Sequence, residues 1–222
     1  MRMRRKGHLF ERLDDCSEHI LVVEDYDFYK KPPKERINIL DLQKAFGNSN
    51  PIHMEIGSGK GGFIYEMATK NPDVNFIAVE KISNVILSLA ERLKEKPLKN
   101  LRIINCGAEN LLCYIKPHVL EKIYLNFSCP YPKKGYKNHR LTNERFLTIY
   151  KQILVDKGEI HQKTDNQILF EYSIETFSQN GFKLRNVSLD LHNSEFEGNI
   201  MTEYEKMFSD KGLPIYRLEA FL

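Results

Sequence analysis

Short apolar runs alternate along the chain with segments whose apolar residues recur at helical spacing. The runs predict strands at 52–56, 75–80, 101–105, 122–127, 158–163, 187–191 and 215–220. The periodic segments predict helices at 36–46, 62–70, 83–96, 143–154 and 167–180. Strands that alternate with helices in this way favour an α/β fold, a mostly parallel sheet with helices on both faces.

The first 36 residues differ from the rest of the chain. They begin with Arg2, Arg4, Arg5 and Lys6 and include the run Lys30-Lys31-Pro32-Pro33-Lys34, which can neither continue a helix nor pair centrally in a sheet. We therefore expect a basic N-terminal extension at 1–36 and one domain at 37–222. A chain of 222 residues with 41% hydrophobic and 28% charged residues fits that division.

Charge and cysteine content narrow the class of protein only slightly. The net charge of +3 is too small to indicate an anionic partner without knowledge of how the charges are distributed. The four cysteines are widely spaced and form no zinc-type pattern, which predicts reduced thiols in a cytosol and no metal site. No long apolar stretch follows the basic start, so neither a signal peptide nor a membrane span is expected.

The pattern Gly57-x-Gly59-x-x-Gly62 follows the first predicted strand of the domain and precedes a helix. Glycines there let the backbone approach a ligand and leave a helix N-terminus facing it. The loop is not a Walker A loop, because Phe63 stands where that motif needs Lys. A dinucleotide and S-adenosylmethionine are the remaining ligands.

Two acids lie near this loop, and one of them distinguishes between the two ligands. Glu80 ends the next strand, where a carboxylate can accept hydrogen bonds from both ribose hydroxyls of either ligand. Glu55 lies two residues before the first glycine, where its charge would repel a pyrophosphate. The same charge attracts the sulfonium and ammonium groups of S-adenosylmethionine. The sequence therefore predicts a methyl-donor site, and a nicotinamide-dependent oxidoreductase is the less favoured alternative.

A basic loop follows the strand predicted at 122–127. Lys133, Lys134, Lys137 and Arg140 lie within eight residues, interspersed with the rings of Tyr131, Tyr136 and His139. Cations hold phosphates and flat rings stack on bases, as in proteins that bind looped RNA. The loop predicts an RNA contact.

These motifs resemble those of the bacterial tRNA (guanine-N7-)-methyltransferases. The family carries Ser-Asp-Pro-Trp-Pro-Lys-Lys after the fourth strand of its domain, where this chain has Ser128-Cys129-Pro130-Tyr131-Pro132-Lys133-Lys134. It also carries Lys-Thr-Asp-Asn and Thr-x-Tyr-Glu, matched here by Lys163-Thr164-Asp165-Asn166 and Thr202-Glu203-Tyr204-Glu205. The resemblance covers nearly the whole chain and implies a Rossmann-like class I methyltransferase fold with a seven-stranded sheet whose last strand is antiparallel.

The resemblance also implies an activity and a set of site residues. The activity is methyl transfer from S-adenosylmethionine to N7 of a guanosine in the tRNA variable loop, position 46 in tRNA numbering, by a cytoplasmic monomer or homodimer. Cofactor-binding positions are Glu55, Gly57, Gly59, Glu80, Gly107 and Cys129. Cys129 and Asp165 are the catalytic positions. Substrate-binding positions are Lys133, Asp165, Thr202, Glu203, Tyr204 and Glu205, and RNA-contacting positions are Gly135, Tyr136, Lys137, Asn138, His139 and Arg140.

This chain departs from the family at two acidic positions. Cys129 replaces an aspartate, and Gly107 replaces an acid after the third strand, where Glu109 or Asn105 could take its place. Guanine N7 has a lone pair and no proton, so attack on the donor methyl needs no general base. We therefore expect reduced turnover rather than a different reaction. The alternatives are a catalytically weakened tRNA-binding protein of the same fold and a cytosine methyltransferase that uses Cys129 as nucleophile.

Three segments also have purely structural interpretations. Asp165 could cap the helix that follows it, and Asn143 could cap the helix at 143–154. Thr202 and Glu205 have the spacing of a capping box.

Overall fold

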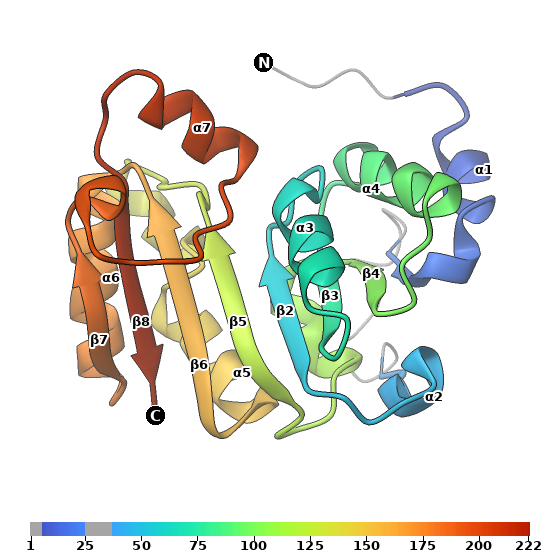
Figure 1. Ribbon diagram of the computed structural model, residues 1–222. Helices are drawn as coiled ribbons and strands as arrows, with labels where there is room; N and C mark the ends of the chain where they lie inside the picture. The colour runs from blue at the N-terminus through green and yellow to red at the C-terminus, as the bar shows by residue number, and fades with distance from the viewer. Residues whose placement is uncertain (1–5, 25–36) are drawn as a thin grey trace. The chain divides into compact units, whose positions relative to one another are not determined.

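The chain divides into two compact units, Met1–Ile115 and Lys116–Leu222. Their structure comes from a computed structural model, which describes residues 6–24 and 37–222 (Figure 1). The basic residues on which the predicted N-terminal extension rests, Arg2, Arg4, Arg5 and the run Lys30–Lys34, lie outside these described residues.

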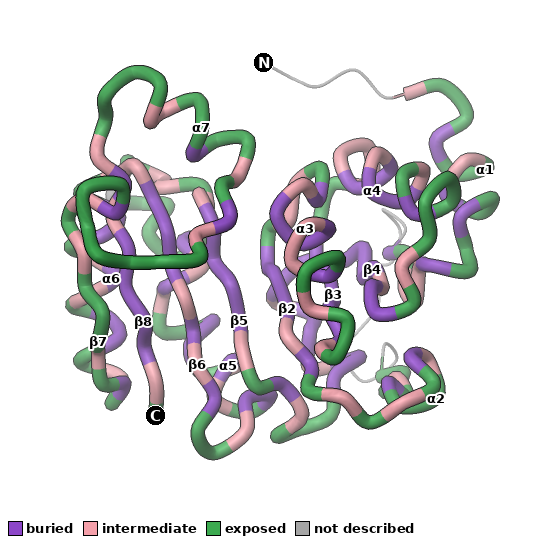
Figure 2. The backbone as a smooth tube through the Cα atoms, in the orientation of Figure 1, coloured by how far each residue is buried: buried purple, intermediate pink, exposed green. Residues whose placement is uncertain are grey.

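The described part of the N-terminal unit contains four parallel strands in the order β1-β4-β3-β2. They are β1 (Ile20–Val23), β2 (Ile52–Ile56), β3 (Asn75–Val79) and β4 (Leu101–Asn105). Every residue of β3 is buried (Figure 2), as expected for a strand with neighbours on both sides and helices packed against it. Because β2, β3 and β4 run in the same direction, the segments that follow them leave one edge of this half-sheet.

Four α-helices lie in the described residues of this unit. They are α1 (Leu9–Asp14), α2 (Leu42–Phe46), α3 (Gly62–Lys70) and α4 (Ser83–Glu95), with 3-10 turns at Ser17–His19 and Ala108–Cys113. On α4 the buried residues Ile86, Leu89, Ala90 and Leu93 recur at helical spacing. Gly61 precedes α3 with φ of +76°, and a Cβ there would meet the buried Leu89 side chain at 2.5 Å, so only glycine fits.

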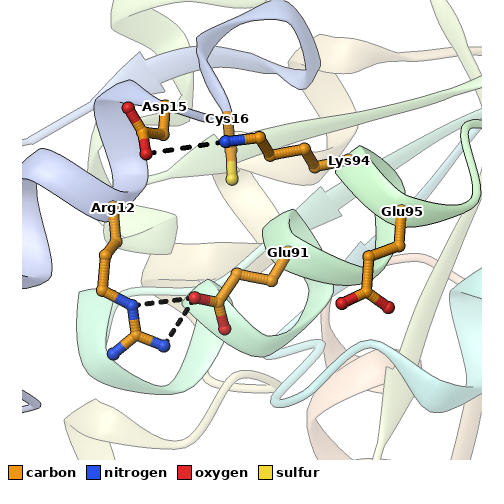
Figure 3. A pocket seen from close by; sticks show the side chains of 6 residues that line it. All are labelled: Arg12, Asp15, Cys16, Glu91, Lys94 and Glu95. Atoms are coloured by element: carbon orange, nitrogen blue, oxygen red, sulfur yellow. Dashed lines mark hydrogen bonds and ion pairs between the residues drawn. The ribbon is translucent and has the colours of Figure 1, made fainter.

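Helix α1 packs against α4 within the N-terminal unit. Arg12 donates to Glu91 Oε1 from both Nε and Nη2, and Lys94 Nζ lies 3.5 Å from Asp15 Oδ2 (Figure 3). The buried Cys16 lies between these two ion pairs. Residues 9–24 are therefore ordered parts of the N-terminal unit, and β1 adds a strand next to β4.

The C-terminal unit contains β5 (Leu120–Asn126), β6 (Leu154–Thr164), β7 (Lys183–Ser188) and β8 (Tyr216–Phe221) in the order β5-β6-β8-β7. Strand β6 is parallel to β5, and β8 is antiparallel to both β6 and β7. Helices α5 (Glu144–Ile153) and α6 (Gln167–Gln179) cover one face of these strands, and α7 (Glu203–Ser209) lies beyond the carboxyl end of β6 (Figure 1). Two further 3-10 turns span Lys134–His139 and Leu191–Asn193.

Most of the predicted elements are confirmed within a few residues. The strands at 52–56 and 101–105 and the helix at 62–70 have the predicted bounds, and the last strand is antiparallel as expected. Asn143 caps α5, and Thr202 with Glu205 forms the predicted capping box at α7.

Three predictions about elements are wrong. The described residues contain eight strands rather than seven, because β1 arises from the N-terminal extension. The helix predicted at 36–46 is shorter and begins at Leu42, after its cap Asp41. The preceding backbone pairs elsewhere, because Asn38 N donates to Cys113 O and Leu40 N to Tyr114 O. The cap of α6 is Asn166, whose side chain accepts from Leu169 N, and not Asp165.

Candidate functional site

The glycine loop after β2 is tied to the end of the neighbouring strand. Gly57 and Ser58 both donate to the carbonyl of Val79, at 2.8 and 3.0 Å. Gly57 and Gly59 have φ of +79° and +60°, in the left-handed region that favours glycine. A Cβ at Gly59 would meet nothing within 4 Å, so the loop leaves open space where a ligand can approach the backbone.

Glu80 connects this loop to the start of α4. Its Oε2 accepts from Gly59 N at 3.0 Å, and its Oε1 accepts from Ile82 N at 2.8 Å. The carboxylate is half-buried, and each oxygen keeps a further lone pair. Glu80 therefore stands at the strand end where the sequence placed it, held in one orientation by two backbone donors. Glu55, two residues before Gly57, is buried at the end of β2.

The segment after β4 is held by a buried carboxylate from another part of the chain, which the sequence did not indicate. Glu24, directly after β1, accepts from Asn110 Nδ2 at 2.8 Å, from Gly107 N at 3.3 Å and from Tyr114 Oη at 3.3 Å. Burial raises the pKa of the Tyr114 hydroxyl, and the charge of Glu24 adds to this effect. Gly107, a predicted cofactor-binding position at which the family keeps an acid, is itself buried. Glu24 fixes the backbone of this segment.

The segment after β5 has an unusual backbone. Phe127 and Tyr131 have φ of +49° and +40°, which costs about 1 to 3 kcal/mol for each such non-glycine residue. Phe127 N donates to Lys163 O at 2.8 Å, and the Phe127 ring stacks on Phe208 at 6.2 Å. Cys129, between the two strained residues, is exposed. All four cysteines are free thiols, and the other three are buried. Strained backbone held by its surroundings is frequent at functional sites.

The basic loop presents rings and cations to solvent. The rings of Tyr131, Tyr136 and His139 are neighbours, with centroids 5.5 Å apart for Tyr131 and His139 and 5.8 Å apart for Tyr136 and His139. The predicted positions Lys133, Gly135, Lys137 and Asn138 are exposed, so they can reach a large polyanion.

Arg140 differs from the other predicted RNA-contacting residues because it is buried. Its Nε donates to Pro130 O at 2.8 Å and its Nη2 to Tyr131 O at 3.1 Å, and the guanidinium lies 4.5 Å from the Tyr172 ring. In this structure the side chain of Arg140 holds the loop together. Any contribution to RNA binding would come through the loop that it positions.

A buried ion pair joins two of the sequence motifs. Lys163 Nζ lies 2.6 Å from Glu205 Oε2 and also donates to Ile200 O at 2.8 Å and Asn199 Oδ1 at 3.0 Å. The Glu205 side chain is fully buried, and His192 Nε2 lies 3.3 Å from its Oε1. Glu205, a predicted substrate-binding position, therefore anchors the chain between β6 and α7. No motif in the sequence predicted this role of Lys163.

Of the other predicted substrate positions, Lys133 is in the basic loop, and the rest follow β6 or begin α7. Asp165 follows β6 and is half-buried, whereas Glu203 and Tyr204 in the first turn of α7 are exposed. The Tyr204 ring stacks on Phe127 with centroids 6.5 Å apart. Thr202 caps α7 by accepting from Glu205 N at 2.9 Å. The Lys163–Glu205 pair thus brings the ends of β5 and β6 and the start of α7 together within the C-terminal unit.

In two other polar clusters, charged side chains pair with one another. An open groove of about 440 Å³ is lined by the side chains in Figure 3, and four of them form ion pairs across α1 and α4, Arg12 with Glu91 and Lys94 with Asp15. Among the described residues, Glu159, His161 and Glu219 have ligand atoms close enough to hold a metal ion. Lys122, Arg185 and Arg217 already neutralise these two carboxylates.

Burial shapes the charge states in this second cluster. Burial lowers the pKa of His161 to about 4, helped by the positive charge of Lys122, so the ring is neutral at pH 7. Burial alone would raise the pKa of Glu219, but hydrogen bonds from Arg185 and Arg217 hold it at about 2. The cluster is a closed network of ion pairs on the strands of the C-terminal unit.

Known proteins that are similar to this chain, in sequence or in structure, are methyltransferases. Residues 49–218 match a family model described as "Putative methyltransferase". The 16S rRNA methyltransferase KamB has the same fold with a TM-score of 0.63 at 13% identity, covering 83% of this chain and 94% of KamB. The 16S rRNA (adenine(1408)-N(1))-methyltransferase of Catenulisporales acidiphilia, solved with cosubstrate SAM, gives a TM-score of 0.56 at 15% identity. The match covers 86% of this chain and 91% of that protein. The chain therefore has the α/β, Rossmann-like class I methyltransferase fold.

One relative defines the family within this class. A tRNA (guanine-N(7)-)-methyltransferase from Bacillus cytotoxicus is 47% identical over 220 residues, 99% of this chain and 96% of the relative. The chain belongs to the tRNA (guanine-N7-)-methyltransferase family. In residues 6–24 and 37–222, none of the helices has both the length and the apolar character that crossing a membrane requires.

Lys163→Met tests the buried ion pair. The variant leaves the Glu205 carboxylate buried without its cation, and breaking such a pair typically costs about 3–5 kcal/mol of unfolding free energy. We expect a loss of this size in urea denaturation followed by circular dichroism. The double variant Lys163→Met with Glu205→Gln removes both charges and should recover part of that loss. Equal stability of Lys163→Met and the unmodified protein would contradict the structural role.

His161→Gln tests the neutral imidazole. The folded-state pKa of about 4 lies below the ordinary 6.5, so the unfolded chain binds more protons between these values. The free energy of unfolding should therefore fall as the pH falls from 6.5 to 4, by up to about 3 kcal/mol from this group. Urea denaturation across pH 4–8 should show a shallower fall for His161→Gln. Parallel curves for the two proteins would rule out this contribution.

Proposed function

We propose that the protein transfers a methyl group from S-adenosylmethionine to N7 of a guanosine in tRNA, at the variable-loop position 46 in tRNA numbering. The observation that carries the proposal is the 47% identity, over nearly the whole chain, to a protein named for this reaction. The site geometry supports it independently. Free thiols and a tRNA substrate favour the cytoplasm as the compartment.

The donor would be held by the N-terminal unit. Open space at Gly59, the half-buried Glu80 carboxylate and the buried negative charge of Glu55 suit a ligand with a ribose and two cationic groups. When bound, S-adenosylmethionine supplies an electrophilic methyl group on a sulfonium. Glu80 accepts hydrogen bonds from the ribose hydroxyls and so fixes the rotation of the donor. The lack of any phosphate in the ligand explains why an acid at position 55 is tolerated.

The C-terminal unit would hold the tRNA. The exposed Lys133 and Lys137 bind phosphates, and the rings of Tyr131, Tyr136 and His139 provide stacking surfaces for bases. Asp165, half-buried after β6, can accept hydrogen bonds from the N1 and N2 groups of guanine. Because N7 already has its lone pair available, these residues need to position the base and have no proton to remove.

The first test follows the label from the methyl donor. Unmodified tRNA is incubated with the protein and S-adenosylmethionine labelled in its methyl group, and N7-methylguanosine is mapped by chemical strand scission. We expect scission at the variable-loop guanosine. Binding of tRNA and donor without transfer would favour the alternative of a catalytically weakened tRNA-binding protein. Label on cytosine would instead point to Cys129 as a nucleophile.

Cys129→Asp tests the replaced acid. Cysteine is a poor hydrogen-bond acceptor, whereas a carboxylate would hold the guanine donors and favour positive charge developing on the ring. A hydrogen bond to a charged group is worth about 1.5–3 kcal/mol, so kcat at saturating donor should rise about tenfold to a hundredfold. Cys129→Asn, similar in size but neutral, is the matched control and should give a smaller rise. No rise with Cys129→Asp would mean that the thiol is adequate.

A further inference from the structure

A carboxylate from two residues further along the chain lies over Gly107 near the end of β4. Glu109, in the 3-10 turn Ala108–Cys113, folds back over Gly107. A Cβ built on Gly107 would lie 2.6 Å from Glu109 Oε2 and 2.9 Å from Oε1. The Glu109 carboxylate therefore stands where the side chain of residue 107 would begin, and the absence of a side chain at 107 makes that placement possible.

Other polar groups near the end of β4 are committed to the fold. Asn105 is fully buried, donates from Nδ2 to Glu80 O at 2.7 Å and accepts from Ser83 Oγ at 2.7 Å. Glu24 is 6% exposed and accepts from Gly107 and Asn110, as described above. Glu109 retains 32% side-chain exposure, and Lys81 Nζ holds its Oε1 at 3.1 Å. A carboxylate has about four lone-pair sites, so this ion pair still allows a ligand to donate to it.

Strand order indicates which part of the donor lies there. Strands β2, β3 and β4 are parallel neighbours, about 4.8 Å apart, and their carboxyl ends lie at one edge. The donor's amino-acid part belongs at the glycine loop after β2, and its ribose belongs at Glu80 after β3. The next group along the molecule is adenine, so it reaches the end of β4. Adenine offers a 6-amino donor, and a carboxylate is an acceptor that matches it.

We propose that Glu109 accepts a hydrogen bond from the 6-amino group of the donor's adenine and so supplies, from two residues further along, the carboxylate that position 107 lacks. The inference rests on the proposed function. Of the two residues that the sequence offered for this place, it assigns base recognition to Glu109, because the Asn105 side chain is already bonded to Glu80 and Ser83. Lys81 orients the Glu109 carboxylate through their ion pair.

Isothermal titration calorimetry with two ligands isolates this contact. One ligand is S-adenosylhomocysteine, the demethylated donor. The other is its analogue with purine in place of adenine, which lacks only the 6-amino group. Wild type should bind the adenine ligand about tenfold or more tightly, a loss typical of removing a hydrogen bond to a charged group. In Glu109→Ala the ratio of the affinities for the adenine and purine ligands should be close to one. The affinity for the purine ligand itself should hardly change.

Two further variants keep the result interpretable. Gly107→Asp combined with Glu109→Ala moves the carboxylate to position 107 and should restore the preference for adenine. Lys81→Met removes the ion pair that orients the carboxylate but leaves the carboxylate itself, so the preference for adenine should weaken and still persist. Glu109→Ala with an unchanged preference would overturn the assignment of Glu109. Wild type that binds neither ligand would instead overturn the proposed function, and this inference with it.

Discussion

Lys163 carries a positive charge into the interior of the C-terminal unit, and the positions of the surrounding segments follow from the need to compensate it. A buried ammonium is costly unless it is paired and its donors are satisfied. Glu205, Asn199 and the Ile200 carbonyl supply three acceptors from a segment that follows β6 by more than thirty residues in the chain. Because Glu205 also completes the capping box, the same carboxylate fixes where α7 begins.

The position of α7 in turn affects the segment after β5. Tyr204 and Phe208 lie on α7, and both stack on Phe127, whose φ is unfavourable for a residue with a side chain. Such strain persists only where neighbouring contacts over-determine the backbone. The ion pair at Lys163 therefore contributes to holding the backbone on one side of Cys129, and Arg140 holds the carbonyls of Pro130 and Tyr131 on the other.

Most of the fold could be predicted from the sequence because its elements have clear periodicity and termini. The helix at 62–70 follows a glycine loop, and the strands at 52–56 and 101–105 are short apolar runs. β1 and α1 were missed because elements of four and six residues in a charge-rich segment are too short to give a periodic signal. Their stability comes from partners far away in the chain, such as Glu91 for Arg12 and Asn105 for the backbone of Glu24.

Candidate site residues were predictable where a motif states a local role, and not where a role depends on tertiary contacts. The carboxylate of Glu80 stands at the strand end that its spacing indicated. The motif did not reveal that Glu205 is fully buried or that Arg140 faces its own loop. Glu24 carried no signal at all, because its partners Gly107, Asn110 and Tyr114 are separated from it by more than eighty residues.

The two positions where the chain departs from its family differ in their energetic consequences. An acid that contacts the adenine of the donor acts in the ground state and the transition state alike, so a carboxylate two residues away can replace it with little change in rate. An acid beside the guanine stabilises charge that develops only during transfer, so its loss falls on kcat. Glu109 lies over Gly107, whereas the neighbours of Cys129 in its own segment are Ser128 and Pro130, neither of which bears a carboxylate. The two proposals together therefore predict that donor binding is retained in this chain while turnover is reduced.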